Sequence, residues 1–179
     1  IYIVRDPRNV ACSVKNHYSL GNYDEVKEFL FREHNWLGII SDDKIKPMEN
    51  KIPTLISSWK TNYLSWKNKT KNYLLIKYEN LLEDPYAEFI KVSKYLENHL
   101  NLKFDEKKIK IAIETCSFEN LQRLEIEGKF KEQTVDKQQN NVKFFHQGPA
   151  NDWKKNLERS ISEEIENKFR VEMQELGYL

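Results

Sequence analysis

IYIVRDPRNVACS, residues 1–13, is the stretch of the chain that decides its fold. Its first four residues are apolar and rich in β-formers, which is typical of a buried strand in a parallel sheet, and Arg5 ends that strand. Asp6 is a favourable N-cap and Pro7 is favoured at the first helical position, so a helix is predicted over residues 7–18. The sequence thus predicts a strand that passes directly into a helix.

A second apolar run, YLLIKY at residues 73–78, predicts another buried strand. Asp84 and Pro85 predict the beginning of a helix that extends to Leu100. Buried strands separated by helices predict an α/β fold, a three-layer sandwich with a parallel sheet. Ligands of such sheets bind at the carboxyl ends of the strands. Arg5 and Tyr78 both lie at strand ends, so we expect them to face one crevice.

The remaining elements follow from apolar periodicity and helix caps. Further helices are expected over residues 23–36, 54–69, 105–114 and 118–127. The last helix is predicted to begin at Ser160 or Ser162. Four apolar residues form its predicted inward face: Ile161, Ile165, Phe169 and Met173. Residues 38–53 and 131–143 lack periodicity and are expected to form loops.

The composition limits what the chain can bind. Its formal net charge is +1, so no bulk field attracts it to nucleic acid, and any anion has to be held by a local cluster. No apolar run approaches the length of a membrane span. Cys12 and Cys116 fit no metal-binding spacing, so no metal is expected, and we interpret both as reduced residues of a cytoplasmic protein.

The length suits one domain, residues 1–179. A core strand with no initiator Met, signal peptide or polar residue before it is seldom a natural N-terminus. We therefore expect that the chain is part of a longer protein and that the domain is partial, with its N-terminal part before Ile1.

The first candidate constellation is Arg5 with Ser13, eight residues further on. A strand end followed at once by a helix N-terminus binds anions through free backbone N–H groups, and Arg adds a fork of donors that matches phosphate oxygens. The Ser13 hydroxyl can close this cup. Alternatively, Arg5 pairs with a local carboxylate and Ser13 is only a small helix residue.

The second candidate is Tyr78, at the end of the second strand. Its ring can lie beside a nucleotide base, and its hydroxyl can reach a ring nitrogen of that base. Alternatively, the ring belongs to the core.

The third candidate is the segment FFHQGPANDWK, residues 144–154. Gly148 allows a ligand to approach the backbone closely, and a protonated His146 can donate to a phosphate. The alternative for the segment is a tight turn fixed by Phe145 and Trp153. The alternative for His146 is a place in the core beside Phe145.

Taken in this order, the motifs resemble the PAPS-dependent sulfotransferase family, in particular its cytosolic-type branch, where PAPS is 3'-phosphoadenosine-5'-phosphosulfate. The resemblance extends from Ile1 to the last helix. Four motifs stand in register: Arg5 with Ser13, the Tyr78-Glu79-Asn80-Leu81 stretch before Asp84-Pro85, Cys116-Ser117-Phe118, and residues 146–154, which match an Arg-Lys-Gly…Gly-Asp-Trp-Lys segment of the family.

The resemblance implies a P-loop-NTPase-like sulfotransferase fold that binds PAPS or its product 3',5'-bisphosphoadenosine (PAP). The implied nucleotide-binding residues are these: Arg5 and Ser13 at the 3'-phosphate, Tyr78 at adenine, Ser117 and Phe118 near the nucleotide, and His146, Gln147 and Gly148, which complete the phosphate cup.

The sequence departs from the family pattern in places. His146 and Gln147 stand where the family has Arg and Lys, which lowers the positive charge expected at the 3'-phosphate, and Cys116 stands where it has a hydroxyl residue. The family's 5'-phosphosulfate loop, catalytic Lys and general-base His precede the first strand. No catalytic residue is therefore assigned within this chain, and the chain alone is expected to be inactive.

A family-type dimer motif would begin at Lys154 and end at Glu163, both of which match. Glu158 and Arg159 stand where the motif has Thr-Val, so that mode of dimerisation is not expected.

The resemblance implies that the complete protein transfers a sulfuryl group to a hydroxyl or amine of a small-molecule or glycan acceptor, which the loops at 38–53 and 131–143 would bind. Two other hypotheses stay open. One is a P-loop kinase-like phosphotransferase, which an additional G-x-x-x-x-G-K-[ST] motif would favour. The other is a degenerate, non-catalytic nucleotide-binding or interaction module, which His146 and Gln147 favour.

Overall fold

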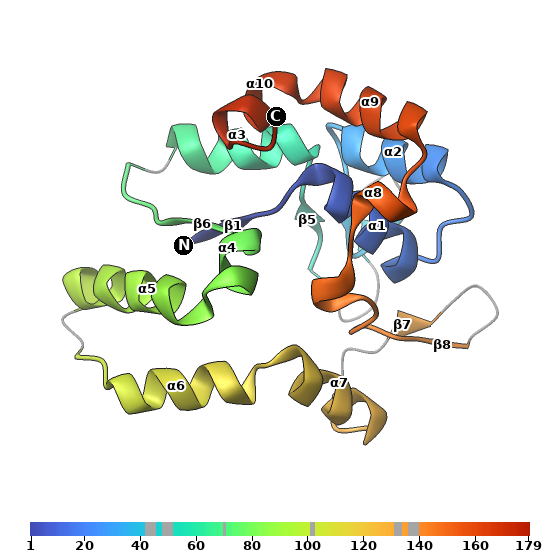
Figure 1. Ribbon diagram of the computed structural model, residues 1–179. Coiled ribbons are helices and arrows are strands. Elements are labelled where there is room, and N and C mark those ends of the chain that lie inside the picture. The colour runs from blue at the N-terminus through green and yellow to red at the C-terminus, as the bar shows by residue number, and fades with distance from the viewer. Residues whose placement is uncertain (42–45, 48–51, 70, 101–102, 131–133, 136–139) are drawn as a thin grey trace. The chain divides into compact units, whose positions relative to one another are not determined.

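A computed structural model describes residues 1–41, 46–47, 52–69, 71–100, 103–130, 134–135 and 140–179. The chain forms two compact units, and Figure 1 shows the course of the backbone through them. Unit 1 consists of Ile1–Arg5, Asn16–Ser19 and Asn72–Asp152. Unit 2 consists of Asp6–Lys15, Leu20–Lys71 and Trp153–Leu179.

Unit 1 contains the predicted parallel strands. β1 (Tyr2–Val4) pairs in parallel with β6 (Leu75–Lys77), and Ile3 stands opposite Ile76. Val4 and Ile76 are buried, but Ile1 and Ile3 are exposed, so the prediction that the whole first run is buried was wrong. The pairing of β1 with β6 confirms the prediction of parallel strands in an α/β fold. Both strands are shorter than predicted, because Arg5 lies beyond β1 and Tyr78 already begins the next helix.

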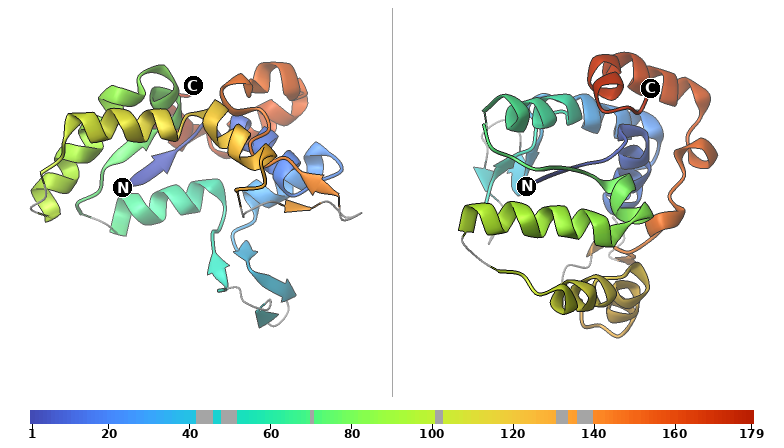
Figure 2. Two further views of the ribbon diagram at one scale, coloured as in Figure 1. Left: turned by 90° about the horizontal axis from the view of Figure 1, so that it is seen from below. Right: turned by 60° about the vertical axis from the view of Figure 1, so that its left-hand side comes forward.

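Four helices follow β6 in unit 1: α4 (Tyr78–Glu83), α5 (Pro85–Leu100), α6 (Glu106–Thr115) and α7 (Phe118–Ile126). The acidic caps predicted from the sequence are present, since Asp84 Oδ1 accepts from the Ala87 N–H (2.9 Å) and Asp105 Oδ1 from the Lys107 N–H (2.8 Å). α5 packs against both α4 and α6 (Figures 1 and 2).

Two short antiparallel strands, β7 (Thr134–Val135) and β8 (Asn141–Val142), lie within the predicted 131–143 loop. The rest of that stretch is mostly outside the described residues. A 3₁₀ turn, η1 (Gly148–Ala150), follows in unit 1.

Unit 2 is mainly helical. Its helices are most of α1 (Pro7–His17), α2 (Tyr23–Phe31), α3 (Trp59–Lys69), α8 (Trp153–Asn156), α9 (Arg159–Lys168) and α10 (Arg170–Glu175). Its core includes the predicted face of the last helix, since Ile161, Ile165, Phe169 and Met173 are all buried. The rings of Phe31 and Trp59 contact Phe169, so the end of α2 and the beginning of α3 pack against this face.

Arg8 links three segments of unit 2. Its guanidinium pairs with Asp6 (2.7 Å) and Glu166 (2.6 Å), donates to the carbonyl oxygen of Tyr178 (2.9 Å), and lies 4.0 Å from the Trp153 ring centroid. Burial alone lowers the pKa of Arg8, but the hydrogen bonds to Asp6 and Glu166 raise it above its ordinary value. The beginning of α1 is thereby fixed to α8 and α9.

Two helix predictions in unit 2 were wrong at their boundaries. The helix predicted over residues 23–36 ends at Phe31, and β2 (Trp36–Leu37) pairs in antiparallel fashion with β5 (Thr54–Leu55). The helix predicted from Thr54 therefore begins only at Trp59, where Ser58 Oγ caps it by accepting from the Thr61 N–H (3.1 Å). Hydrogen bonds between distant segments overrode the local helical preference.

The predicted loop at residues 38–53 also holds a strand pair. β3 (Ile39–Ser41) and β4 (Lys46–Pro47) are antiparallel, and the other central residues of this loop lie outside the described ranges.

The last helix differs from its prediction in two respects. Glu158, in extended conformation, is the N-cap of α9, whereas Ser160 and Ser162 lie within the helix. A break at Phe169 separates α9 from α10. Of the helices in the described ranges, none combines the length and the apolar character that a membrane crossing demands.

Candidate nucleotide-binding site

Arg5 and Tyr78 meet where the two parallel strands end. Val4 pairs with Lys77, so the residue after each strand emerges at the same edge of the sheet. The guanidinium carbon of Arg5 lies 4.3 Å from the centroid of the Tyr78 ring, in a cation–π arrangement. Both residues are half-buried, so Tyr78 is not enclosed in the core. The structure thus brings together the two residues that the strand ends predicted.

The beginning of α1 offers fewer free donors than its sequence predicts. Pro7 has no N–H, and the Arg8 N–H donates to Asp6 Oδ1 (2.9 Å). The Asp6 carboxylate is paired with the Arg8 guanidinium, so the donors of that side chain are engaged as well. Ser13 is exposed on the part of α1 that belongs to unit 2, whereas Arg5 belongs to unit 1. The role of Ser13 stays a prediction.

Ser117 and Phe118 begin α7. Ser117 is the N-cap, and its Oγ accepts from the Asn120 N–H (3.3 Å). This bond uses the hydroxyl oxygen as an acceptor and leaves its O–H as a donor. The Phe118 ring lies edge-on to Phe145 with their centroids 6.3 Å apart. Two of the predicted nucleotide residues are therefore positioned by the cap and first turn of one helix.

Gly148 packs directly against Phe118. Its φ is +50°, and a Cβ built on it would lie 2.3 Å from Phe118 Cε2. A glycine is therefore required here by the backbone conformation and by the neighbouring ring. Within unit 1 the Phe118 ring approaches this glycine closely, and the approach of a ligand to its backbone stays a prediction.

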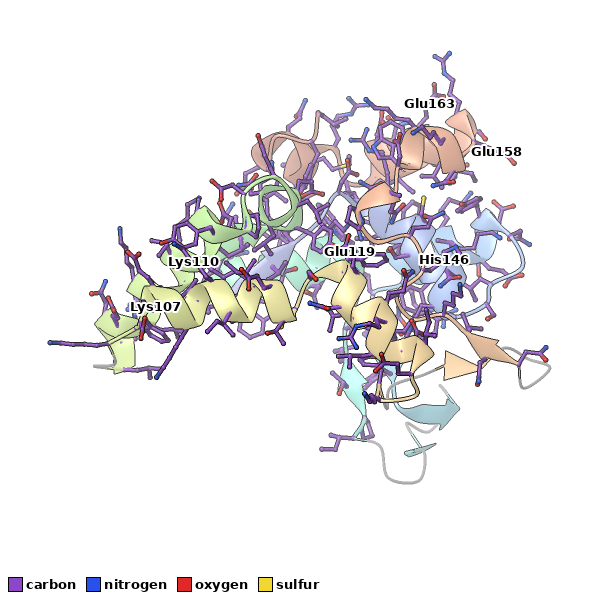
Figure 3. The ribbon with its side chains drawn as sticks, turned by 60° about the horizontal axis from the view of Figure 1, so that its bottom comes forward. Lys107, Lys110, Glu119, His146, Glu158 and Glu163 are labelled. Atoms are coloured by element: carbon purple, nitrogen blue, oxygen red, sulfur yellow. The ribbon has the colours of Figure 1, made fainter. Side chains whose placement is uncertain are left out.

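His146 and Gln147 precede this glycine. His146 is exposed (Figure 3), so the alternative that places it in the core beside Phe145 is wrong. Gln147 is half-buried, and its carbonyl oxygen accepts from the Ala150 N–H (2.9 Å). An exposed imidazole is free to meet a ligand from solvent.

Residues 1–177 match the family model described as "Sulfotransferase domain". The chain belongs to the sulfotransferase family. It is 31% identical over 114 residues to cytosolic sulfotransferase 12 of Arabidopsis thaliana, a match that covers 60% of this chain and 32% of the relative.

Two solved structures share the fold. A mouse sulfotransferase complexed with PAP aligns with a TM-score of 0.63 and 18% identity, covering 96% of this chain and 56% of its own. Retinol dehydratase in a complex with retinol and PAP aligns with a TM-score of 0.63 and 17% identity, covering 96% of this chain and 46% of its own. The predicted P-loop-like sulfotransferase fold is confirmed, and the chain spans about half the length of these two structures and about a third of the plant relative.

The segment of the family's dimer motif, from Lys154 to Glu163, begins in α8 and ends in α9 of this sulfotransferase chain. Glu158 is the N-cap of α9, and Glu163 lies within that helix (Figure 3). Arg159 Nε donates to Glu163 Oε1 (2.7 Å), so the two residues pair within the helix. The loss of the family's dimer mode stays a prediction.

Sequence reasoning missed two residues of α7 that contact the segment before His146. Glu125 is 7% exposed and accepts from the backbone N–H groups of Phe144 and Phe145. Gln122 donates to the carbonyl oxygen of Phe145. Their spacing from Phe118, four and seven residues, was the available signal, because these positions share one face of a helix. Among the described residues no group of His, Cys, Asp or Glu side chains is arranged to hold a metal ion.

Proposed function

We propose that the complete protein transfers a sulfuryl group from PAPS to a hydroxyl or amine acceptor, and that this chain binds the adenosine and 3'-phosphate of the donor. In this reaction the bond between sulfur and the bridging phosphate oxygen breaks and a bond from sulfur to the acceptor atom forms. The acceptor loses a proton to a base, and PAP leaves. The residues of this chain assigned to the site bind the donor.

The observation that carries the proposal is the cation–π contact of Arg5 with Tyr78 at the ends of β1 and β6. A guanidinium carries a planar fork of N–H donors that can bind phosphate oxygens in pairs. The Tyr78 hydroxyl and ring edge are suited to adenine. One pair of neighbouring residues can therefore recognise the base and the charged group of the same nucleotide.

The rest of the proposed site comes from α7 and from residues 146–148. The Ser117 hydroxyl keeps a donor for the nucleotide, and exposed His146 supplies a charged donor when protonated. The family match and two PAP-bound structures of the same fold support PAP as the ligand.

We also propose that the acceptor is a small molecule or a glycan and that the stretches at 38–53 and 131–143 contact it, since loops set specificity on a fixed scaffold. The name of the Arabidopsis relative supports a cytoplasmic location. A fold alone does not determine the reaction, as the dehydratase of the same fold illustrates, so activity has to be measured.

The test is calorimetry on the complete protein with PAP and with 5'-AMP, which lacks the 3'-phosphate. The wild type should prefer PAP, and Arg5→Ala should lose about 1.5–3 kcal/mol of PAP binding with little change for 5'-AMP. Arg159→Ala, at an exposed pair on α9, is the matched control. Equal affinities of the wild type for both nucleotides would overturn the nucleotide assignment. PAP binding without transfer from PAPS to a panel of hydroxyl and amine acceptors would favour the non-catalytic module.

A further inference from the structure

One face of α7 holds the segment that leads into residues 146–148. Phe118, Gln122 and Glu125 are spaced by four and three residues, so their side chains project from the same side of the helix. The later a residue stands in α7, the earlier in the segment is the residue that it contacts. Glu125 contacts the backbone of residues 144 and 145, Gln122 contacts residue 145, and Phe118 packs on Gly148. All of these residues belong to unit 1.

Glu125 binds two consecutive backbone N–H groups. Its Oε1 accepts from Phe144 (2.6 Å) and its Oε2 from Phe145 (3.1 Å). Gln122 Nε2 donates to the carbonyl oxygen of Phe145 (3.1 Å), so both polar groups of that residue's backbone are held by α7. Hydrogen bonds to a carboxylate are shorter and stronger than neutral ones, and Glu125 is only 7% exposed. Such a contact fixes the direction of the backbone, as well as its distance from the helix.

His146, Gln147 and Gly148 follow Phe145, and the contacts that they can make with a phosphate depend on the direction of this backbone. Long Arg and Lys side chains can reach a phosphate from several backbone positions, because they have many rotatable bonds. His146 is shorter, and Gln147 and the backbone N–H groups carry no charge. A site that relies on such groups needs an accurately placed backbone.

We propose that Glu125, assisted by Gln122, is a positioning residue of the 3'-phosphate site. By holding Phe144 and Phe145 it sets the position and direction of the backbone that continues through His146, Gln147 and Gly148. This inference rests on the proposed function, because it takes PAP as the ligand. It assigns Glu125 no contact with the nucleotide.

A purely structural role for Glu125 makes a different prediction. Loss of packing or of two buried hydrogen bonds would lower the unfolding temperature and weaken all ligands together. A positioning role changes the preference for PAP over 5'-AMP, since only PAP carries the 3'-phosphate. The ratio of the two affinities is therefore the readout.

The experiment measures PAP and 5'-AMP binding by calorimetry on the complete protein, with the unfolding temperature recorded for each variant. Glu125→Gln leaves one acceptor oxygen for one N–H and turns an NH₂ group toward the other. We expect the PAP preference to fall about tenfold, which equals about 1.4 kcal/mol, while 5'-AMP affinity stays within about twofold. Glu127→Gln is the matched control, because Glu127 lies next to the same helix end and pairs with Arg123 and Lys129.

Gln122→Ala is the second variant, and it decides the outcome if Glu125→Gln does not fold. It removes one hydrogen bond to Phe145 and should lower the PAP preference about threefold. A wild type that prefers PAP, with both variants keeping that preference, would overturn this inference and leave the proposed function intact. A wild type that does not distinguish PAP from 5'-AMP would overturn the proposed function and this inference with it.

Discussion

The guanidinium carbon of Arg5 lies 4.3 Å from the centroid of the Tyr78 ring, and the two residues follow strands that pair in parallel. The sheet register brings the two residues together, and a cation–π contact joins their side chains. Variants of Tyr78 that keep or remove the ring can therefore separate the contribution of its hydroxyl from its effect on Arg5.

Tyr78→Phe keeps the ring under Arg5 and removes the hydroxyl. If that hydroxyl reaches adenine, PAP and 5'-AMP affinities should fall by the same factor, about 2–10-fold, because both contain adenine. Tyr78→Leu also removes the cation–π partner of Arg5 and should weaken PAP further than 5'-AMP. Calorimetry on the complete protein measures both ratios. Tyr86→Leu, which removes a ring near Lys110 in the same unit, is the control. An unchanged PAP preference in Tyr78→Leu would contradict the prediction.

Gly148→Ala is expected to destabilise the protein by roughly 2–4 kcal/mol. A left-handed conformation costs a non-glycine residue about 1 kcal/mol, and the new Cβ would meet the Phe118 ring at 2.3 Å. Gly128→Ala measures the cost of the left-handed conformation without a steric clash, because Gly128 has a φ of +69° and open space around it. It should cost only about 1 kcal/mol.

Denaturant unfolding of both variants measures the difference. Phe118→Leu combined with Gly148→Ala should recover part of the loss, since a smaller side chain leaves room for the methyl group. Equal costs for the two glycine variants would show that Phe118 can move aside.

Apolar runs and helix-capping residues predicted those strands and helices whose signals lie within a few residues of one another. The apolar runs before Arg5 and Tyr78 became paired strands, and the Asp-Pro and Asp-capped starts became α5 and α6. The strand pair of Trp36–Leu37 with Thr54–Leu55 could not be predicted, because each strand has two residues and its partner is distant in sequence. Such pairs depend on tertiary contacts, and the periodicity of apolar residues carries no information about those contacts.

The candidate site shows the same division. Strand ends predicted that Arg5 and Tyr78 lie together, as they do, whereas the Phe118 ring that packs on Gly148 was not predicted. Glu125 was missed because a glutamate near the end of an amphipathic helix normally faces solvent. Its burial follows from the two backbone N–H groups that reach it from residues far along the chain.

His146→Arg is expected to raise PAP affinity about tenfold at pH 8 and to leave 5'-AMP affinity unchanged. Arg is charged throughout, whereas a neutral imidazole offers a weaker hydrogen bond to phosphate than a protonated one. The ratio of wild-type to variant affinity should therefore fall as the pH rises. Both proteins meet the same phosphate ionisation, so the ratio isolates residue 146.

His99→Arg adds the same charge to an exposed histidine of the same unit and serves as the control for that experiment. An equal gain in both variants would assign the effect to general charge. A ratio that stays flat with pH would show that His146 contributes no charged hydrogen bond to the 3'-phosphate.

Glu175 gives unit 2 an acid-sensitive contact between α10 and α3. Its carboxylate accepts from Lys67 Nζ (2.5 Å) and from the Tyr63 hydroxyl (2.8 Å), and the hydrogen bond from Lys67 is the main reason that the pKa of Glu175 is lowered. A group with a lowered folded-state pKa stabilises the fold above its unfolded pKa, near 4.5. This contribution is lost as the pH falls through the folded-state value.

Glu175→Gln should therefore lower the unfolding temperature of the complete protein at pH 7 and have a smaller effect at pH 3, because a larger fraction of the wild-type carboxyl is then protonated and resembles the amide. Calorimetric scans at both pH values measure the difference, and subtraction of the variant removes the effect of all other carboxyl groups. Glu163→Gln is the control, because its partner Arg159 is exposed and such pairs contribute little. A difference between wild type and Glu175→Gln that persists unchanged at pH 3 would show that packing of the side chain, and not its charge, stabilises the contact with Lys67 and Tyr63.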